Sequence, residues 1–330
     1  MVRVVRFHKT GGPEVLQIEN VSIGAPGSGE LRLRVHALGL NRAEAMFRAG
    51  TYLEQPTLPS GLGYEAAGTV EEIGEGVSGF SIGDKVSTIP GFSMNRHGVY
   101  GEEAIVPAAI VVKHPENLSW EEAAAIWMKF MTAYGALIDV AGLAAGEAVI
   151  ITAASSSVGL AAIQIANAAG ATSIAVTRTA AKRDALLHQG ARHVIVTREQ
   201  DLVEEVKRIT DGKGARVIFD PVTGEGVDTL AQAAAKFGTI ILYGALSASA
   251  TPFPLFAAIS KGLTLRGYTL FEVVSDPKRM AKAKRYILDG LTSGKLKPVI
   301  GKTFPFEQIV EAHRFLESNE QIGKIVVTVP

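Results

Sequence analysis

A serine-rich turn follows an apolar strand and precedes an apolar helical segment: Ala153-Ala154-Ser155-Ser156-Ser157-Val158-Gly159. A dinucleotide site needs a tight turn, a close approach of the backbone to the pyrophosphate and close helix packing. At the G-x-G-x-x-G spacing the chain has Ala154, Ser156 and Gly159, which are small enough for that approach. We expect phosphate contacts from Ser156, Ser157, Val158 and Gly159. An ordinary strand–turn–helix with serine caps is the alternative.

The end of the next strand indicates which dinucleotide fits. NAD sites carry an acidic residue about 20 positions after the turn, where it binds the ribose hydroxyls. This chain has Val176-Thr177-Arg178-Thr179 there, followed by Lys182, and no carboxylate. Arg178 and Lys182 suit a 2′-phosphate, because a guanidinium binds phosphate through two donors and an ammonium acts as a point charge. We expect NADPH, with Thr177 in the same pocket. Solvated cations at a helix start are the alternative.

Composition narrows the class of protein. The 330 residues include 33 Lys+Arg and 33 Asp+Glu, so the formal net charge is zero. A neutral chain lacks the positive field that favours nucleic acid or an anionic membrane surface. Without a cysteine it has no disulfide, thiol nucleophile or cysteine-ligated zinc site. The apolar stretch 148–171 is interrupted by polar residues, so we expect strand, turn and helix in a cytoplasmic protein rather than a membrane span.

Two hydrophobic patterns divide the chain. Near the N-terminus, Leu31, Leu33 and Val35 alternate with polar side chains, and glycines are frequent, which is typical of an irregular antiparallel barrel. Ser119 and Glu122 have the spacing of a capping box, which predicts a helix running toward Val140. Apolar strands then alternate with helices, the pattern of a doubly wound parallel sheet.

The expected strands of that sheet are 148–152, 173–177, 193–196, 216–220, 239–243 and 263–266. The expected helices between them are 158–169, 180–188, 202–210 and 227–235. After residue 268 we expect two more helices and a last strand, 324–329.

Short motifs also occur in a fixed order along nearly the whole chain. They are Gly39-Leu40-Asn41-Arg42, Arg48-Ala49-Gly50-Thr51-Tyr52, Gly63-Tyr64-Glu65-Ala66-Ala67-Gly68, Gly83-Asp84-Lys85-Val86, Thr132-Ala133-Tyr134 and Gly323-Lys324-Ile325-Val326. Together they resemble the zinc-independent quinone oxidoreductase branch of the medium-chain dehydrogenase/reductase superfamily. The resemblance implies an α/β protein: a GroES-like irregular β-barrel catalytic domain (1–124), a Rossmann NADP-binding domain (125–268) and a C-terminal segment (269–330) that returns to the catalytic domain.

Departures from the superfamily pattern bear on the chemistry. Zinc-dependent members hold a catalytic metal with a Cys, the His of a Gly-His-Glu segment and a further ligand. Here Asn41 and Tyr64 stand at the first two positions, and the seven histidines show no paired spacing. We therefore expect no metal. Without a Lewis acid, interconversion of simple alcohols and ketones is disfavoured. The expected substrate is electron-poor already, a quinone or an enone that accepts hydride from NADPH.

The resemblance implies that Asn41 and Tyr52 lie near the nicotinamide and that Tyr64 stands at the former metal position. Each could donate a hydrogen bond to the oxygen on which negative charge develops. A phenol stays protonated at neutral pH, so donation suits the tyrosines better than base catalysis. The alternatives are a helix cap for Asn41 and packed rings for Tyr52 and Tyr64.

Other cofactor contacts are expected in loops at the carboxyl ends of the parallel strands, where ligands bind. The resemblance implies Thr132 at the nicotinamide end of the cofactor. It also implies backbone contacts from Gly244, Ala245 and Leu246, a pocket wall at Phe271, and Lys324 near the cleft. Core packing for Phe271 and a solvated position for Lys324 are the alternatives.

The strand Leu263-Thr264-Leu265-Arg266 would be the last of its sheet, and an open apolar edge favours association. We expect a homodimer through this edge, as is common in the superfamily, with a small-molecule quinone or enone as substrate and no nucleic-acid or membrane partner. Two other functions stay open: an enoyl reductase acting on acyl thioesters, and a non-catalytic NADPH- or RNA-binding relative like the crystallin members of this branch.

Overall fold

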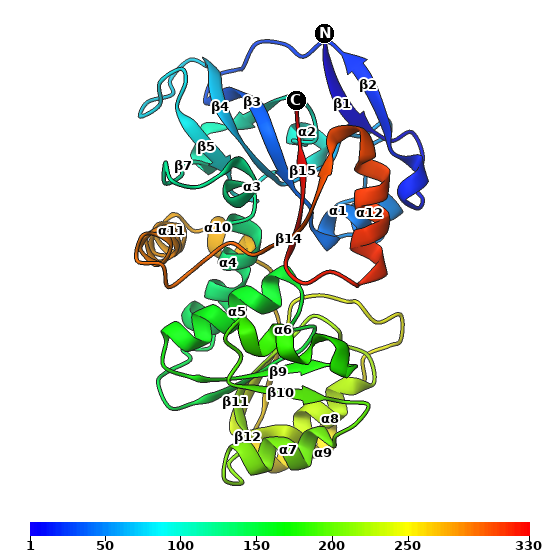
Figure 1. Cartoon of the computed structure of the whole chain (residues 1–330), viewed down its shortest axis with the longest axis vertical. Helices are drawn as coiled ribbons and strands as arrows, with labels where there is room; N and C mark the ends of the chain where they lie inside the picture. Colours follow the sequence, from blue (N-terminus) through cyan, green and yellow to red (C-terminus); the bar gives the residue numbers. More distant parts are fainter. The chain divides into compact units, whose positions relative to one another are not determined.

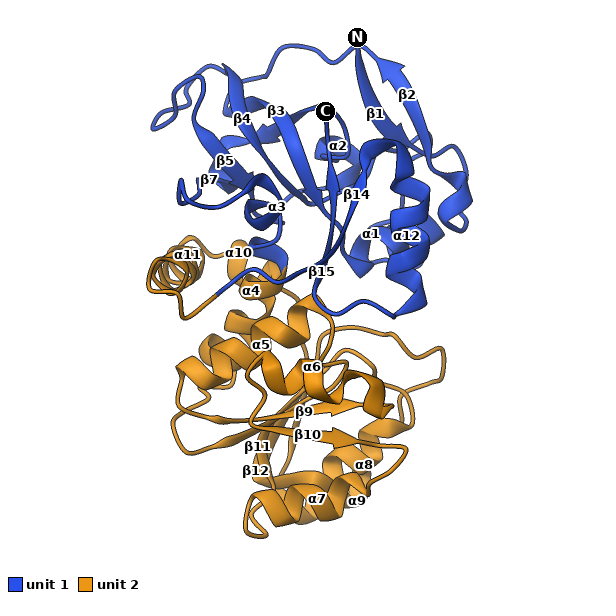
Figure 2. Ribbon diagram, viewed as in Figure 1, with its two compact units in different colours: residues 1–128, 297–330 blue, residues 129–296 orange.

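The computed structural model describes residues 1–330 and divides into two compact units (Figure 2), residues 1–128 with 297–330, and residues 129–296. The expected boundaries, after 124 and 268, differ from these chiefly because 269–296 packs in the second unit. There the Tyr134 and Tyr286 ring centroids lie 4.8 Å apart, and Arg279 Nε donates to Asp139 Oδ2 at 2.7 Å. Only the last part of the expected C-terminal segment belongs to the first unit.

The first unit is built on a sheet in the order β14-β15-β3-β4-β5-β7, with β6 also pairing with β3 (Figure 1). Its strands are β3 (Glu30–Gly39), β4 (Glu65–Ile73), β5 (Lys85–Thr88), β6 (Glu103–Pro107), β7 (Val111–Lys113), β14 (Ile300–Pro305) and β15 (Lys324–Thr328), and β1 (Val2–Arg6) pairs separately with β2 (Gln17–Val21). Its helices are α1 (Arg42–Ala49), α2 (Met94–His97), α3 (Trp120–Ala123) and α12 (Ile309–Ser318). The predicted alternation in β3 is confirmed, because Leu31, Leu33 and Val35 are fully buried.

The second unit has a parallel sheet in the order β10-β9-β8-β11-β12-β13, which is the doubly wound order 3-2-1-4-5-6 of dinucleotide-binding folds. Its strands are β8 (Ala148–Ile151), β9 (Thr172–Thr177), β10 (His193–Val196), β11 (Ala215–Asp220), β12 (Ala234–Leu242) and β13 (Thr264–Gly267). Its helices are α5 (Ser157–Ala168), α6 (Arg183–His188), α7 (Leu202–Ile209), α8 (Gly226–Ala233), α9 (Leu255–Lys261), α10 (Phe271–Val274) and α11 (Pro277–Thr292). The predicted fold class is confirmed.

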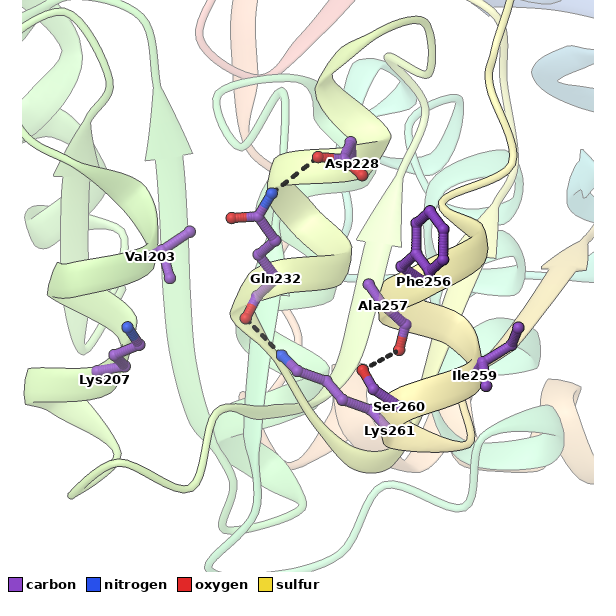
Figure 3. A pocket seen from close by; sticks show the side chains of 9 residues that line it. All are labelled: Val203, Lys207, Asp228, Gln232, Phe256, Ala257, Ile259, Ser260 and Lys261. Carbon is purple, nitrogen blue, oxygen red and sulfur yellow. Dashed lines mark hydrogen bonds between the residues drawn. The ribbon is translucent and has the colours of Figure 1, made fainter.

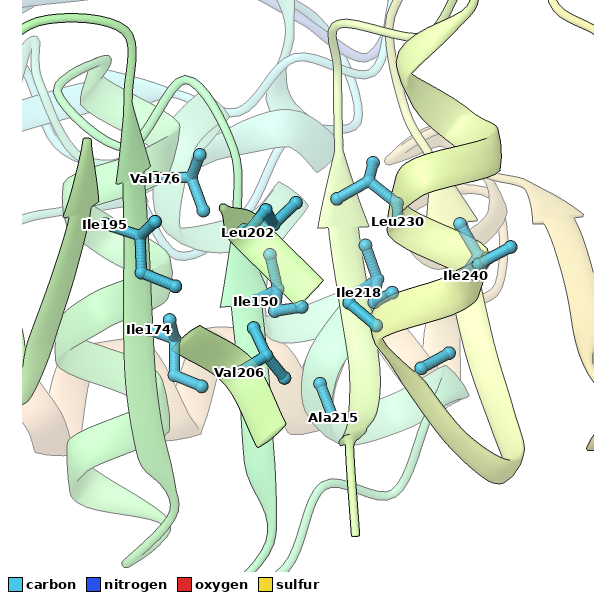
Figure 4. Packing of buried hydrophobic residues seen from close by; sticks show 13 residues of the cluster. Ile150, Ile174, Val176, Ile195, Leu202, Val206, Ala215, Ile218, Leu230 and Ile240 are labelled. Carbon is cyan, nitrogen blue, oxygen red and sulfur yellow. The ribbon is translucent and has the colours of Figure 1, made fainter. Parts of the chain in front are cut away.

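Buried side chains lie on both faces of this sheet, and one large cluster packs between one face and α7 and α8. Figure 4 shows Ile150, Ile174 and Ile218 projecting from β8, β9 and β11 toward Val206 of α7. Leu230 of α8 belongs to the same cluster. β-Branched side chains fit a pleated, buried strand well. This packing fixes the carboxyl ends of the strands, where the phosphate-binding turn begins.

The single helix expected from Ser119 toward Val140 is interrupted. The capping box is present, since Ser119 Oγ accepts from Glu122 N at 3.2 Å and Glu122 Oε2 accepts from Ser119 N at 2.9 Å. However, α3 ends at Ala123, and α4 (Trp127–Tyr134) begins anew and continues as the π-helical segment η3 (Gly135–Val140). The new helix start is held by a tertiary contact: the Met128 N–H, which has no acceptor within α4, donates to Glu65 Oε1 at 2.9 Å.

The stretch Trp120–Val140 is long and apolar enough to cross a membrane by length and composition, with a mean hydropathy of 1.2. Of its most apolar window, 83% is buried within the protein, as is usual for core helices of globular proteins. The apolar stretch 148–171 forms β8, the turn and α5, as the sequence predicted.

Candidate active site

The serine-rich turn lies between β8 and α5 in the second unit. Ser156 is the N-cap of α5, and its Oγ accepts from the Gly159 N–H at 3.0 Å. Position 159 requires glycine, because a Cβ there would lie 2.5 Å from the Ala154 carbonyl oxygen. The serine cap is therefore present, but it uses the Gly159 N–H and not those of Ser157 and Val158. The first N–H groups of a helix have no intrahelical partner and bind anions.

A cation contacts this turn directly. Lys182 Nζ donates to Ser155 Oγ at 3.0 Å, joining the end of the second strand–helix connection to the phosphate-binding turn. Arg178 directly follows β9 and is exposed, and Thr177 ends that strand. These side chains are hydrogen-bond donors and no carboxylate lies among them, so the residues present fit a dinucleotide with an additional phosphate.

The segments at the carboxyl ends of β8 and β11 are held together by a buried carboxylate. Asp220 accepts from the Val222 N–H at 3.0 Å and from the Thr223 N–H at 2.8 Å, and it also accepts from Thr152 Oγ1. This role was not predicted from the sequence; the available signal was a carboxylate at the end of an apolar parallel strand. Because Thr152 immediately precedes the serine-rich turn, Asp220 connects that turn to the loop after β11.

The predicted contacts Gly244, Ala245 and Leu246 follow β12 against the same loop. The Leu246 N–H donates to the Pro221 carbonyl at 3.0 Å, and a Cβ at Gly244 would lie 3.0 Å from Pro221 Cβ. Thr132 is buried in α4, and Phe271, which begins α10, is partly buried. The cofactor contacts of these residues stay predictions.

A buried polar network occupies the first unit. Lys324 Nζ donates to Asn41 Oδ1 at 2.5 Å and to Glu65 Oε2, and the side chains of Lys324 and Glu65 are almost completely buried. The amide of Asn41 donates to Glu65 Oε2 and to Glu44 Oε1, each at 3.1 Å, and to the Gly39 carbonyl at 3.2 Å. Lys324 is therefore not a solvated lysine at a strand end.

Asn41 occupies the N-cap position of α1, but its side chain makes no capping hydrogen bond. The alternative that Asn41 caps the helix is therefore wrong, because its Oδ1, the atom that would accept a helix N–H, accepts from Lys324 Nζ instead. Glu44, in the first turn of α1, was also missed by sequence analysis. Its Oε1 accepts from the Tyr64 N–H at 3.1 Å, and burial raises the pKa of Glu44 to about 7.

Tyr52 and Tyr64 lie together in this unit, with ring centroids 6.4 Å apart and a hydrogen bond between their hydroxyls. Tyr64 is almost fully buried and also contacts Phe92, with ring centroids 5.5 Å apart, so packing is part of its role. Burial raises the pKa of Tyr52 to about 12 and that of Tyr64 further. Both phenols are therefore neutral at physiological pH, and their role as donors to a substrate stays a prediction.

The residues of the first unit do not fit a catalytic zinc ion. No group of three or more His, Asp or Glu side chains has the arrangement of a metal site. Asn41 and Glu65, the polar side chains best placed to bind a cation, both accept from the Lys324 ammonium. A metal ion there would be repelled by that charge.

A groove of about 660 Å³ lies between α7, α8 and α9 (Figure 3). None of the predicted site residues lines it. Lys261, a cation that lines the groove, donates to the carbonyl oxygens of Gln232 at 2.5 Å and Ala234 at 2.8 Å, at the C-terminus of α8. A lysine there offsets the negative end of the helix dipole, so we assign the groove no part in the chemistry.

Comparisons with known proteins cover the whole chain. Residues 27–116 match the family model described as alcohol dehydrogenase GroES-like domain, and residues 157–285 match the one described as zinc-binding dehydrogenase. Human quinone oxidoreductase is 32% identical over 329 residues, which are 99% of this chain and 98% of that protein.

Two solved structures are similarly close. Escherichia coli quinone oxidoreductase, solved in complex with NADPH, has a TM-score of 0.90 and 31% identity, covering 99% of each chain. A structure described as an NAD-dependent alcohol dehydrogenase has a TM-score of 0.92 and 33% identity, covering 99% of this chain and 100% of that one.

Proposed function

The chain belongs to the quinone oxidoreductase branch of the medium-chain dehydrogenase/reductase superfamily, and on this premise we propose that it is a metal-free oxidoreductase that uses NADPH to reduce quinones or α,β-unsaturated carbonyl compounds. The proposal depends most on one observation. The Lys182 ammonium contacts Ser155 in the phosphate-binding turn at 3.0 Å, at a strand end that lacks the carboxylate of NAD sites.

NADPH rather than NADH is favoured by the donors around this turn. Lys182 and Arg178 are suited to the 2′-phosphate, while Ser157 and Val158 offer N–H groups of the α5 N-terminus to the pyrophosphate. The similarity to E. coli quinone oxidoreductase in complex with NADPH supports this choice. A structure described as an NAD-dependent alcohol dehydrogenase is equally similar, so the preference for NADPH over NADH has to be measured.

Bound NADPH would supply a hydride to the acceptor, leaving NADP⁺ and an anionic product that takes up one proton. The task of the protein is to orient the acceptor and to stabilise the negative charge on its oxygen. We assign this donor role to the hydrogen-bonded pair Tyr52 and Tyr64. Asn41 is a weaker candidate, because its amide hydrogens already face Gly39, Glu44 and Glu65.

We also propose that the protein is a homodimer joined through β13. This strand lies at the edge of its sheet, where backbone groups are available for pairing with a second copy. Nearby α9 carries exposed apolar side chains, including Phe256 and Ile259. Their burial in an interface would remove apolar surface from water.

The deciding experiment measures NADPH consumption with quinones, cyclic enones, chain enals and acyl thioesters, with and without a chelator. We expect turnover of a quinone or an enone that the chelator leaves unchanged. Faster turnover of acyl thioesters would favour an enoyl reductase. NADPH binding without any turnover, together with a salt-sensitive RNA gel shift, would favour the non-catalytic alternative.

A further inference from the structure

Glu44 is a buried carboxyl group without a cationic partner. Its side chain is completely buried and makes no ion pair. The only ammonium nearby, that of Lys324, donates to Asn41 and to Glu65 instead. Ionisation is disfavoured in such a place, because burial removes the water around the carboxylate and the charge of Lys324 offsets this only in part.

The two oxygens of Glu44 have different surroundings. Oε1 accepts from Asn41 Nδ2 and from the Tyr64 N–H, each at 3.1 Å. Oε2 is buried without a hydrogen-bond partner. This is the pattern of a carboxylic acid that accepts at one oxygen and carries its proton on the other.

Glu65 shows the opposite pattern within the same network. Its Oε1 accepts from the Met128 N–H, and its Oε2 accepts from Asn41 and from the Lys324 ammonium. Both oxygens are thus occupied by donors, one of which is charged. Asn41 therefore bonds to one carboxyl group that has an ion pair, Glu65, and to one that has none, Glu44.

The groups that would feel a charge on Glu44 include the proposed oxyanion donors. The titratable groups facing it are Lys324 of β15, Glu65 of β4 and the phenols of Tyr52, Tyr64 and Tyr100. A negative charge on Glu44 would act on all three phenols. It would also oppose the negative charge that develops on a substrate oxygen held by Tyr52 and Tyr64.

We propose that Glu44 is a positioning residue that must be a neutral carboxylic acid during reduction: it holds Asn41 and the Tyr64 backbone without placing a negative charge beside the Tyr52–Tyr64 pair. This inference rests on the proposed function, because it assumes that those phenols stabilise an oxyanion. It differs from proton donation, since neutrality and shape are required rather than a transferable proton.

The test compares the pH dependence of kcat for the wild type and Glu44→Gln, whose amide is neutral at every pH. We expect the wild-type kcat to fall about tenfold per pH unit once Glu44 ionises. Glu44→Gln should keep at least about a third of the wild-type kcat at pH 6, roughly the loss of one neutral hydrogen bond, and should lack this alkaline fall. The matched control is Glu54→Gln, because Glu54 is the other carboxyl whose charge acts on both Tyr52 and Tyr64; it should keep the fall.

Two outcomes would overturn the inference. One is a Glu44→Gln protein that binds NADPH and retains its thermal stability but is inactive at every pH, because the residue would then be needed as a base or proton donor. The other is an unchanged alkaline fall in this variant.

A readout without turnover separates this inference from the proposed function. Infrared difference spectra of Glu44→Gln against the wild type at pH 6 should show the loss of a neutral carboxylic acid band that shifts in heavy water. Absence of that band would refute the neutral state of Glu44 even if quinones are reduced. Its presence in a protein that reduces no quinone or enone would leave the neutral state intact and refute the proposed function.

Discussion

Lys182 is the residue on which the nucleotide preference depends most directly. Its ammonium is held at 3.0 Å from Ser155 Oγ, where it would attract a 2′-phosphate more strongly than a 2′-hydroxyl. A hydrogen bond to a charged group contributes about 1.5–3 kcal/mol, and about 1.4 kcal/mol is a tenfold change in affinity. We predict that Lys182→Ala weakens NADPH binding about tenfold or more and leaves NADH binding within about twofold, as measured by fluorescence titration. Arg178→Ala should act in the same direction.

Arg183→Ala is the matched control for this prediction. It removes a neighbouring cation that pairs with Glu199 at 2.9 Å and does not contact the serine-rich turn. It should leave the ratio of NADPH to NADH affinity unchanged. Equal weakening of both nucleotides by Lys182→Ala would mean that the residue supports the conformation of the turn rather than recognising the phosphate.

Glu44 also has a predictable effect on stability. Burial raises its pKa from the ordinary 4.5 to about 7, so the folded protein holds this proton more tightly than the unfolded chain. The stabilisation is complete below pH 4.5 and is lost as the pH rises through 7. At about 1.4 kcal/mol per pH unit, the loss is about 3 kcal/mol. We predict that chemical denaturation shows the unfolding free energy of the wild type decreasing relative to Glu44→Gln over this range. Parallel curves for the two proteins would contradict the assignment.

At the level of the elements, Gly39 at the end of β3 packs closely against Ala124 and against Lys324 of the buried network. A Cβ at Gly39 would lie 2.0 Å from the Ala124 carbonyl oxygen and 2.9 Å from Lys324 Cε. We predict that Gly39→Ala costs about 1–3 kcal/mol of stability, as overpacked cores do. It should also slow NADPH oxidation, because it displaces Lys324 from Asn41. Thermal unfolding and initial rates measure the two effects.

Gly61→Ala provides the comparison within the same unit. A Cβ at Gly61 would meet no heavy atom within 4 Å, and its backbone is not in the left-handed region. It should therefore change neither the melting temperature nor the rate appreciably. A Gly39→Ala protein as stable as Gly61→Ala would show that the Ala124 segment can move aside.

Elements set by local pattern could be predicted from the sequence. Most of the strand–helix alternation between 148 and 266 is found within a few residues of the expected bounds, because buried parallel strands are continuous apolar runs. Two differences are that β12 begins at Ala234 instead of 239 and that α9 was not predicted. Elements decided by tertiary contacts could not. The start of α4 is held by Glu65, a residue distant in sequence that accepts from the Met128 N–H. Strand β14 is largely exposed, so its apolar pattern is weak.

The same distinction holds for the candidate site. The serine-rich turn and its cations were found because their spacing follows the strand and helix that carry them. The buried polar network could not be predicted, because it joins three separate segments of the chain. These segments carry Asn41 with Glu44, then Glu65, and finally Lys324. Asn41 has the sequence position of a helix cap, but its Oδ1 accepts from Lys324, a residue far away along the chain.

At the scale of the whole molecule, the exposed apolar surface predicts that two copies of the chain associate. Phe256 is 86% exposed and Ile259 is 70% exposed, and Figure 3 shows both on α9, which immediately precedes the edge strand β13. Exposed apolar side chains beside an unpaired sheet edge favour an interface. We predict that the wild type is a dimer of the 34.8 kDa chain and that the double variant Phe256→Glu with Ile259→Lys is a monomer at micromolar concentration.

Light scattering coupled to size exclusion, over a range of protein concentrations, measures the mass in each case. Leu187→Glu is the control, because Leu187 is also an exposed apolar residue, 45% accessible, but lies on α6 rather than beside β13. It should leave the dimer intact. Both substitutions in the double variant are at exposed positions, so they should not lower the melting temperature by disturbing the core. A wild type that stays monomeric at every concentration would rule out pairing through β13, whereas a double variant that remains dimeric would move the interface away from α9.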